Sequence, residues 1–210
     1  MLLSKILGRG TGLSLLDVGF GAGELARRVK DRCRHLAGIE LDAGVAQLSA
    51  HLFDHWVEGD LVLALKERFD EPFDVIVAGD VLEHLPDPGA ILNLLGPLLA
   101  PEGRLLVSLP NVANIVVRLG LVFGRFDYTP RGILDETHLK FFTRRTGRAL
   151  LTAHGFRVVD VVPTAMPFEL ALPALGRPPL APAVRGGAVL LARTLPGLFG
   201  YQFVYEAVRA

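Results

Sequence analysis

Residues 15–23 read LLDVGFGAG, an apolar run that leads into a loop with glycine at every second position. The segment Leu13–Val18 has the composition of a strand buried on both faces of a sheet. Gly19, Gly21 and Gly23 let the chain turn tightly and let a ligand approach the backbone closely. Such a loop is weak evidence alone, because several nucleotide-binding folds use one and some glycine-rich turns bind nothing.

The same alternation of apolar runs and helical patterns continues through the first two thirds of the chain. It predicts an α/β fold of the Rossmann-like, doubly wound type, with a mostly parallel sheet and helices on both faces. Right-handed crossovers place the loops after the strands along one edge, where open sheets bind ligands. We expect strands at 13–18, 35–40, 55–58, 73–79 and 104–109, helices at 22–33, 43–52 and 88–99, and a turn at 101–103.

The last third has a different organisation. Residues 111–142 form a long insertion before a predicted helix at 143–154, and a loop of that length in a compact domain is usually a functional lid. Strands are predicted at 156–162 and 201–208. The stretch 163–200 between them is rich in Pro, Gly, Ala and Leu. Its prolines argue against one continuous amphipathic helix. This stretch could pack against the rest of the chain, form a homodimer surface or contact a membrane. We favour intramolecular packing or a homodimer surface.

Composition restricts the class of protein. The 210 residues suit one domain, 1–210, and the 22 basic and 22 acidic residues give no net charge, so we expect no nucleic-acid partner. Cys33 is the single cysteine, which rules out an internal disulfide and fits a reducing compartment. The opening MLLSKILGRG lacks the features of a secretory leader, and no apolar run is long enough to span a membrane. We therefore expect a cytoplasmic protein.

Three acids follow three successive predicted strands. Asp17 precedes the first loop glycine, where it would repel a pyrophosphate but attract the ammonium group of a methionine moiety. Glu40 ends the second strand and suits a ribose diol, since a carboxylate accepts two hydroxyl hydrogen bonds. Asp60 follows the third strand and can accept a hydrogen bond from an adenine amino group. Each acid alone could be a solvated loop residue. Together they favour S-adenosylmethionine (SAM) over NAD.

Several longer stretches carry a family resemblance. LLDVGFGAGELA, GIELD, GDL, FDVIVAGDVLEHLPDP and LLAPEGRLLVSLPN resemble the class I SAM-dependent methyltransferases over roughly residues 13–160. The resemblance implies a seven-stranded sheet whose last strand is antiparallel. This sequence departs from the family pattern at Phe20, where many members carry a smaller residue. We expect the Phe20 side chain to face away from the ligand. The cofactor-binding residues that the resemblance implies are Asp17, Gly19, Gly21, Gly23, Glu40, Leu41, Asp60, Leu61, Gly79 and Asp80.

On the acceptor side, Asp80, Glu83 and His84 have i, i+3, i+4 spacing and would share a face if the stretch were helical. His138 lies in the insertion, and with these three it could bind a divalent cation. The D-x-x-E-H pattern resembles the E-x-x-E-H of ubiquinone-pathway O-methyltransferases and small-RNA 2′-O-methyltransferases, in which it holds a metal. Asp80 in place of the first Glu shortens the reach. Two alternatives stay open: His84 and His138 as acid/base groups without metal, or local structural roles.

The insertion has its own resemblance. LPNVANIVVRLGLVFGRFDYTPRGILDETHLKFFT resembles methyltransferases that are often associated with glycosyltransferases and cell-surface polysaccharide assembly. By that resemblance Asn111, Phe126, Tyr128, Asp135 and His138 line or cover the acceptor pocket. The alternative is that the aromatic side chains pack against the sheet.

The sequence hypothesis is therefore a methyltransferase that moves a methyl group from SAM to a small-molecule acceptor, at an oxygen of a sugar, polyol or phenolic compound. One alternative is an NAD(P)-dependent Rossmann oxidoreductase, against which Asp17 speaks. Another is a non-catalytic SAM-binding partner subunit.

Overall fold

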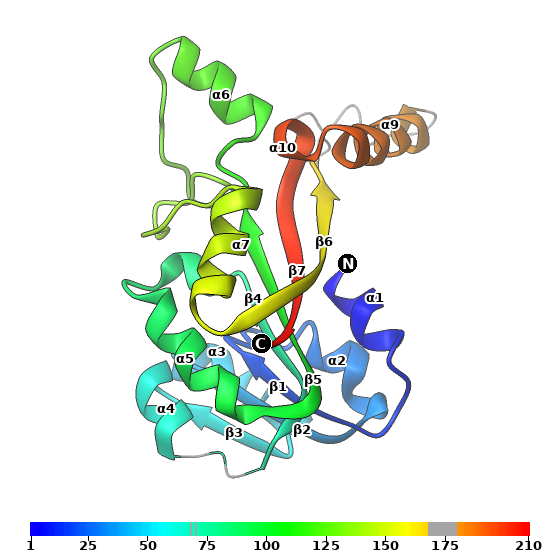
Figure 1. The fold of residues 1–210 in the computed structure, drawn as a ribbon, viewed down its shortest axis with the longest axis vertical. Helices are drawn as coiled ribbons and strands as arrows, with labels where there is room; N and C mark the ends of the chain where they lie inside the picture. The colour runs from blue at the N-terminus through cyan, green and yellow to red at the C-terminus, as the bar shows by residue number, and fades with distance from the viewer. Residues whose placement is uncertain (68, 70, 168–179) are drawn as a thin grey trace.

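The computed structural model describes residues 1–67, 69, 71–167 and 180–210, and it contains one seven-stranded sheet in the order β3-β2-β1-β4-β5-β7-β6 (Figure 1). Neighbouring strands from β3 through β5 are parallel, whereas β7 is antiparallel to both β5 and β6. The predicted Rossmann-like fold class is confirmed. The strands are β1 (Leu13–Val18), β2 (Cys33–Glu40), β3 (His55–Glu58), β4 (Phe73–Gly79), β5 (Leu99–Pro110), β6 (Phe156–Ala165) and β7 (Gly200–Arg209).

Strand β5 begins earlier than predicted. Leu99 already pairs with Phe73, and the pairing then slips before Arg104 pairs with Val75. The turn expected at residues 101–103 is therefore an irregularity within the strand. The predicted strands Leu13–Val18, His55–Glu58 and Phe73–Gly79 have the bounds that the apolar runs indicated.

Helices lie on both faces of the sheet (Figure 1). Side-chain caps begin several of them: Asp42 and Asp87 each accept a backbone N–H three residues on, and Thr143 forms a capping box with Thr146. The helices are α1 (Leu2–Leu7), α2 (Ala26–Val29), α3 (Ala43–Gln47), α4 (Leu61–Glu67), α5 (Pro88–Leu98), α6 (Ile115–Val122), α7 (Arg144–Ala153), α9 (Leu180–Thr194) and α10 (Pro196–Phe199), with 3-10 turns at Lys30–Arg32, Ala50–Leu52 and Leu82–His84.

Some helix predictions were wrong. The helix expected at 22–33 is reduced to α2 and a 3-10 turn, because Gly21 and Gly23 keep a left-handed backbone and Cys33 already pairs in β2. Helices α1, α4, α6, α9 and α10 were not predicted. Pro182 does not interrupt α9 because it lies in the first turn, where backbone N–H groups have no partner within the helix. Residues 168–179 of the stretch 163–200 lie outside the described residues.

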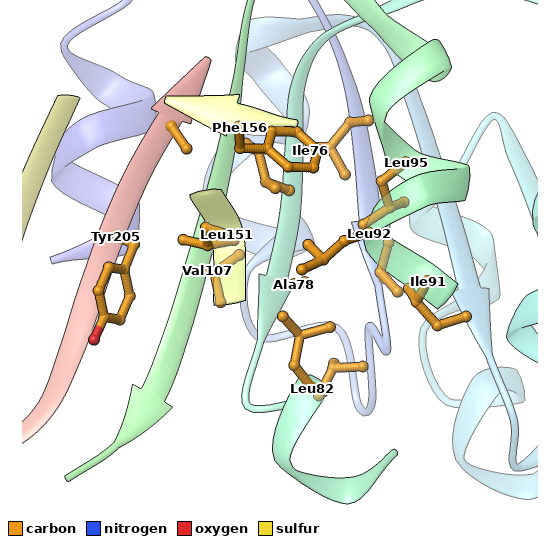
Figure 2. Packing of buried hydrophobic residues seen from close by; sticks show 14 of the residues in the cluster. Ile76, Ala78, Leu82, Ile91, Leu92, Leu95, Val107, Leu151, Phe156 and Tyr205 are labelled. Carbon is orange, nitrogen blue, oxygen red and sulfur yellow. The ribbon is translucent and has the colours of Figure 1, made fainter. Parts of the chain in front are cut away.

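The core has two layers, one on each face of the sheet. Alternation along β1 sends Leu15 to one face and Leu16 to the other, and both side chains are fully buried. Figure 2 shows the larger layer, in which Leu92 and Leu95 of α5 lie near Ile76 of β4. Burying side chains of this size stabilises the fold by roughly 1.5–3 kcal/mol each.

Two ion pairs hold the N-terminal helix α1 to β6 and β7 of the sheet. Lys5 Nζ donates to Asp160 Oδ2 at 2.7 Å and to Glu206 Oε2 at 2.6 Å, which ties α1 to β6 and β7. Both acids raise the pKa of Lys5, although burial opposes them. This attachment brings Leu2 beside Gly79 at the carboxyl end of β4.

None of the helices in the described part of the chain has the length and apolar character that crossing a bilayer requires.

Candidate cofactor and acceptor site

Two cavities lie along the carboxyl ends of the parallel strands. One has a volume of about 550 Å³ and the other of about 370 Å³, and Gly19 and Asp80 line both. Every residue predicted to bind the cofactor lines one of them except Gly23. The larger is lined by the predicted residues Gly19, Glu40, Leu41, Asp60, Leu61 and Asp80, and the smaller by Asp17, Gly19, Gly21, Gly79 and Asp80.

The glycine loop needs glycine at two positions for packing. Gly19 has φ +70°, and a Cβ atom there would lie 2.7 Å from Val81 Cγ2. Gly23 has φ +75°, and a Cβ there would collide with the Ser49 side chain. Gly23 therefore shapes the loop and contacts neither cavity. The ring of Phe20 packs in the core, 4.3 Å from that of Phe53, although Phe20 also contributes to the lining of the smaller cavity.

Asp17 and Glu40 flank this loop. Asp17 is only 5% exposed, and burial together with the nearby Glu40 charge raises its pKa to about 7. Glu40 accepts hydrogen bonds from the backbone N–H of Gly21 at 2.8 Å and of Leu41 at 2.9 Å. A buried carboxyl beside a second carboxylate is a favourable place for a cationic group, since the cation offsets both charges.

Asp60 caps the start of helix α4 at the same edge of the sheet. Its Oδ1 accepts hydrogen bonds from the backbone N–H of Val62 at 2.9 Å and of Leu63 at 3.2 Å, at the start of α4. Because this cap uses one carboxylate oxygen, the other can still accept a bond from a ligand in the larger cavity that Asp60 lines.

Asp80 is the non-glycine residue with positive φ, +57°, among the described residues. Two side chains hold its Oδ1: Ser108 Oγ donates at 2.8 Å and Gln202 Nε2 donates at 2.8 Å. The Asp80 N–H donates in turn to Ser108 Oγ at 3.0 Å. A non-glycine residue in this backbone region costs of order 1–3 kcal/mol and persists only where its surroundings hold it.

The expected shared helical face from Asp80 to His84 does not form. Residues Leu82–His84 make a single 3-10 turn, and Asp80 lies before it with its carboxylate turned towards Ser108 and Gln202. Among the described residues, the group with metal-ligand spacing is Glu83, His84 and His138, whose ligand atoms all lie within 4.8 Å of one another. The prediction of Asp80 as a fourth ligand is therefore corrected.

Glu83 is buried without a partner for its charge. Its side chain is 0% exposed, and both carboxylate oxygens lack a hydrogen-bond partner. Burial raises its pKa to about 8, and the charges of Asp80 and Asp135 add to the increase. Its backbone carbonyl accepts from the N–H groups of Leu139 and Lys140, which joins the insertion to this turn.

The two histidines face each other, with ring centroids 4.8 Å apart. His138 Nδ1 lies 3.1 Å from the Ile133 carbonyl oxygen, so this nitrogen carries the proton and Nε2 keeps its lone pair. His84 Nδ1 lies 3.0 Å from Thr137 Oγ1, and that hydroxyl donates to Asp135 Oδ1. The network therefore also assigns the His84 proton to Nδ1. Burial lowers the pKa of His138, which favours the neutral ring.

These groups line a small polar cavity of about 180 Å³. It shares Asp80 with both cofactor cavities and His84 with the larger one, which places it beside the predicted cofactor site. Its lining residues are Asp80, Glu83, His84, Pro110, Gly132, Asp135, His138, Tyr201 and Gln202.

Only some of the predicted acceptor residues meet in this cavity. Asp135 and His138 line it. Asn111 is instead buried, and its Nδ2 donates to the Gly200 carbonyl at 2.9 Å, a structural contact. Phe126 and Tyr128 line none of the cavities described above; they are exposed and form an aromatic group with Phe141.

Sequence reasoning missed Ser108, Tyr201 and Gln202. The last two come from β7, whose antiparallel insertion between β5 and β6 carries them to the active edge. The predicted strand at 201–208 was correct, but no spacing along the chain relates Gln202 to Asp80, 122 positions away.

The fold defines a Rossmann-like domain with an acid at or near the carboxyl end of each of its first three strands, which is the arrangement predicted for SAM. Comparison with known proteins then gives the family: the profile described as "Methyltransferase domain" matches residues 2–161. The chain belongs to this methyltransferase family. Membership disfavours the NAD(P)-dependent alternative.

Curated relatives bear O-methyltransferase names. The chain is 32% identical over 158 residues to a ubiquinone biosynthesis O-methyltransferase of Xylella fastidiosa, a match that covers 72% of this chain and 63% of the relative. It is 29% identical over 161 residues to the mitochondrial ubiquinone biosynthesis O-methyltransferase of Homo sapiens, covering 72% of this chain and 43% of the relative. The chain thus spans less than two thirds of the length of both relatives.

Solved structures share the fold at low identity. A SAM-dependent methyltransferase from Archaeoglobus fulgidus matches with a TM-score of 0.69 and 20% identity, covering 98% of this chain and 90% of that one. Magnesium protoporphyrin IX methyltransferase from Synechocystis, solved with S-adenosylhomocysteine, matches with a TM-score of 0.66 and 16% identity, covering 100% and 80%.

Proposed function

We propose that this protein transfers the methyl group of SAM to an oxygen of a small-molecule acceptor that binds in the small polar cavity. One observation carries the proposal. The cavities lined by Asp17, Glu40 and Asp60 share Asp80 with a cavity that holds two histidines and a buried carboxyl group. A methyl donor and an acceptor could therefore meet at Asp80.

The proposed cofactor roles follow the chemistry of each cavity. The buried Asp17 carboxyl accepts the ammonium group of the methionine part, near the backbone of Gly19, Gly21 and Gly79. Glu40 accepts the ribose hydroxyls, and Asp60 accepts from the adenine amino group. Leu41 and Leu61 are apolar lining residues of the larger cavity, which suits contact with the flat adenine ring.

The reaction is a displacement at a sulfonium. The acceptor oxygen forms a bond to the methyl carbon while the carbon–sulfur bond breaks, and its electron pair stays on sulfur to give S-adenosylhomocysteine. Where no cation occupies these nitrogens, the hydroxyl proton passes to the free Nε2 of His84 or His138. Much of the rate enhancement in such a reaction comes from holding the two reactants close and aligned. The Nδ1 contacts of both histidines to the insertion hold Nε2 in a defined position.

The acceptor is proposed to be a sugar, polyol or phenolic compound. The names of the curated relatives support oxygen as the acceptor atom. The association with glycosyltransferases is untested and stays a prediction from the insertion. A panel of catechols, simple phenols, polyols and sugars, assayed with radiolabelled SAM, distinguishes these classes. If only amine or thiol acceptors take up label, the oxygen assignment is wrong.

A divalent cation fits the group of Glu83, His84 and His138. The fit rests on two unpartnered, buried carboxylate oxygens and on two imidazoles with a free Nε2, each held through Nδ1 as metal-ligating histidines usually are. A bound cation would lower the pKa of an acceptor hydroxyl, as Lewis acids do.

The cation proposal is tested by elemental analysis and divalent-ion titration of wild type and Glu83→Ala, with Glu83→Gln as the isosteric control. We expect metal and metal-stimulated turnover in wild type alone. Equal metal content and equal activity in all three proteins would remove the cation and leave His84 and His138 as acid/base groups.

We also propose that residues 1–210 act as one catalytic domain with residues 111–142 as the acceptor lid. Calorimetry with SAM, S-adenosylhomocysteine and NAD tests the cofactor, and binding of NAD alone would overturn the proposal. Asp17→Ala should abolish SAM binding. SAM turnover in the presence of an accepted substrate separates an enzyme from a non-catalytic SAM-binding subunit.

A further inference from the structure

Two helices that line none of the cavities described above expose large apolar side chains at the same end of the molecule. Helix α6 and the chain after it project at one end of the long axis, and α9 with α10 lies at that end too (Figure 1). We call this surface the apolar end. Its exposed apolar side chains include Val116, Leu119, Leu121, Val122 and Phe123 around α6, and Val189, Leu190, Leu191 and Leu195 around α9.

The exposure here is unusual in degree and in arrangement. Val122 is 77% exposed and Phe123 is 76% exposed. Val116, Leu119 and Phe123 have i, i+3, i+7 spacing, so they share one face of α6. On the surface of a soluble monomeric protein, exposed apolar residues are usually scattered singly, whereas a contiguous group of them marks an interaction site.

The charge at the apolar end has one sign through both helices. The sequence has no Asp or Glu between Glu102 and Asp127, nor between Glu169 and Glu206. Arg118, Arg125 and Arg193 fall within those stretches and are exposed. Asp127, exposed in the chain after α6, offsets part of this charge, but the three arginines leave the end net cationic in a chain with no net charge overall.

The two helices are tied together at their bases. Asn114 begins α6, where its Oδ1 accepts the Val116 N–H, and its Nδ2 donates to the Gly200 carbonyl oxygen at 2.9 Å. Asn111 Nδ2 donates to the same carbonyl at 2.9 Å. Since Gly200 directly follows α10, these buried bonds fix α6 and the α9–α10 region relative to each other, and both can bind one surface together.

We propose that the apolar end docks on the surface of an anionic lipid bilayer. Exposed apolar groups on two helices whose only charged residues are arginines suit the boundary between acidic headgroups and acyl chains. A two-fold contact with a second copy would instead bring like charges together across the interface. Within the described residues neither α6 nor α9 is long enough to span a bilayer, so the proposed contact is with the bilayer surface. Tyr201, adjacent to Gly200, lines the small polar cavity, which places the proposed acceptor site next to the membrane surface.

The test is co-sedimentation of the whole chain with vesicles. Vesicles of 70% phosphatidylcholine and 30% phosphatidylglycerol should bind wild type at least about tenfold more tightly than pure phosphatidylcholine, and 0.5 M NaCl should weaken the binding. Arg118→Gln with Arg125→Gln should lose about fivefold per arginine. Leu119→Ser with Phe123→Ser should lose about tenfold or more, because both remove apolar burial.

Matched controls use exposed residues elsewhere. Leu48→Ser removes a leucine that is 62% exposed on another part of the surface, and Arg157→Gln removes an exposed arginine of β6. Both should bind like wild type. The proposal is overturned if wild type does not sediment with anionic vesicles, or if the paired variants bind as the controls do. It is equally overturned if wild type is a dimer in sedimentation equilibrium that Leu119→Ser with Phe123→Ser converts to monomer, since a second copy would then cover the surface.

Discussion

At the residue scale, the proposed role of Asp17 predicts that cofactor binding depends on pH. Its pKa is about 7 in the free protein because the carboxyl is buried beside Glu40. A cationic ligand group binds the ionised form, so below pH 7 binding must first release a proton. Affinity should therefore rise as the pH increases towards 7 and level off above it.

We predict that the SAM association constant of wild type rises by roughly eightfold between pH 5.5 and 6.5, as the ionised fraction of a carboxyl with a pKa of about 7 does. Asp17→Asn should be roughly 10- to 100-fold weaker near neutral pH, since it loses a hydrogen bond between charged groups. Its pH dependence should be flat over the same interval. Isothermal titration calorimetry in buffers of different ionisation enthalpy measures both affinity and proton release. Parallel pH profiles for the two proteins would contradict the role of Asp17.

Glu83 gives a prediction on stability. Its pKa is about 8 in the folded protein against an ordinary value of 4.5, because burial disfavours the charged form. Between these values the unfolded chain has lost a proton that the folded chain keeps, so stability falls as the pH rises. Glu83→Gln should be increasingly more stable than wild type from pH 5 to pH 8. Urea denaturation in the presence of a chelator checks this, and a constant difference between the two proteins would show that Glu83 ionises normally.

At the scale of elements, Asn114 joins α6 to the turn before β7. Asn114→Ala should cost roughly 1–3 kcal/mol, because it removes a helix cap and a buried hydrogen bond to Gly200. Asn114→Ser should recover part of this cost by capping α6 again. Thermal denaturation of the two variants gives the comparison. If Asn114→Ala has the same free energy of unfolding as wild type, the hydrogen bond from Asn114 to Gly200 does not stabilise the fold.

Elements differed in how far their sequence revealed them. Strand β4 was predicted to the residue because its apolar run from Val75 to Ala78 is uninterrupted and buried on both faces. Helix α6 was missed since its exposed apolar positions do not give the polar face that marks a surface helix. The prediction that Asp80 and Glu83 share a helical face was wrong, because Asp80 adopts a left-handed backbone conformation that the spacing of residues does not indicate.

At the scale of the whole molecule, ligand binding should raise the unfolding temperature. SAM or S-adenosylhomocysteine at a hundred times its Kd should stabilise the fold by about 2.7 kcal/mol. For a chain of this length that corresponds to roughly 5–10 °C in Tm. Differential scanning fluorimetry measures the shift. NAD at the same concentration should leave the Tm unchanged, and a shift with NAD alone would contradict the cofactor assignment.

The sequence by itself determined the fold class and the positions of three acids along the edge of the sheet where the parallel strands end. Parallel strands end at one edge, so Asp17, Glu40 and Asp60 could be located from their places at or just beyond the carboxyl ends of β1, β2 and β3. Only the tertiary structure decided which groups meet on the acceptor side. Glu83 and His138 come together because the insertion hydrogen-bonds to the Glu83 carbonyl, and Gln202 reaches Asp80 because β7 enters the sheet between β5 and β6. Such long-range contacts depend on the packing of distant segments, which local patterns do not encode.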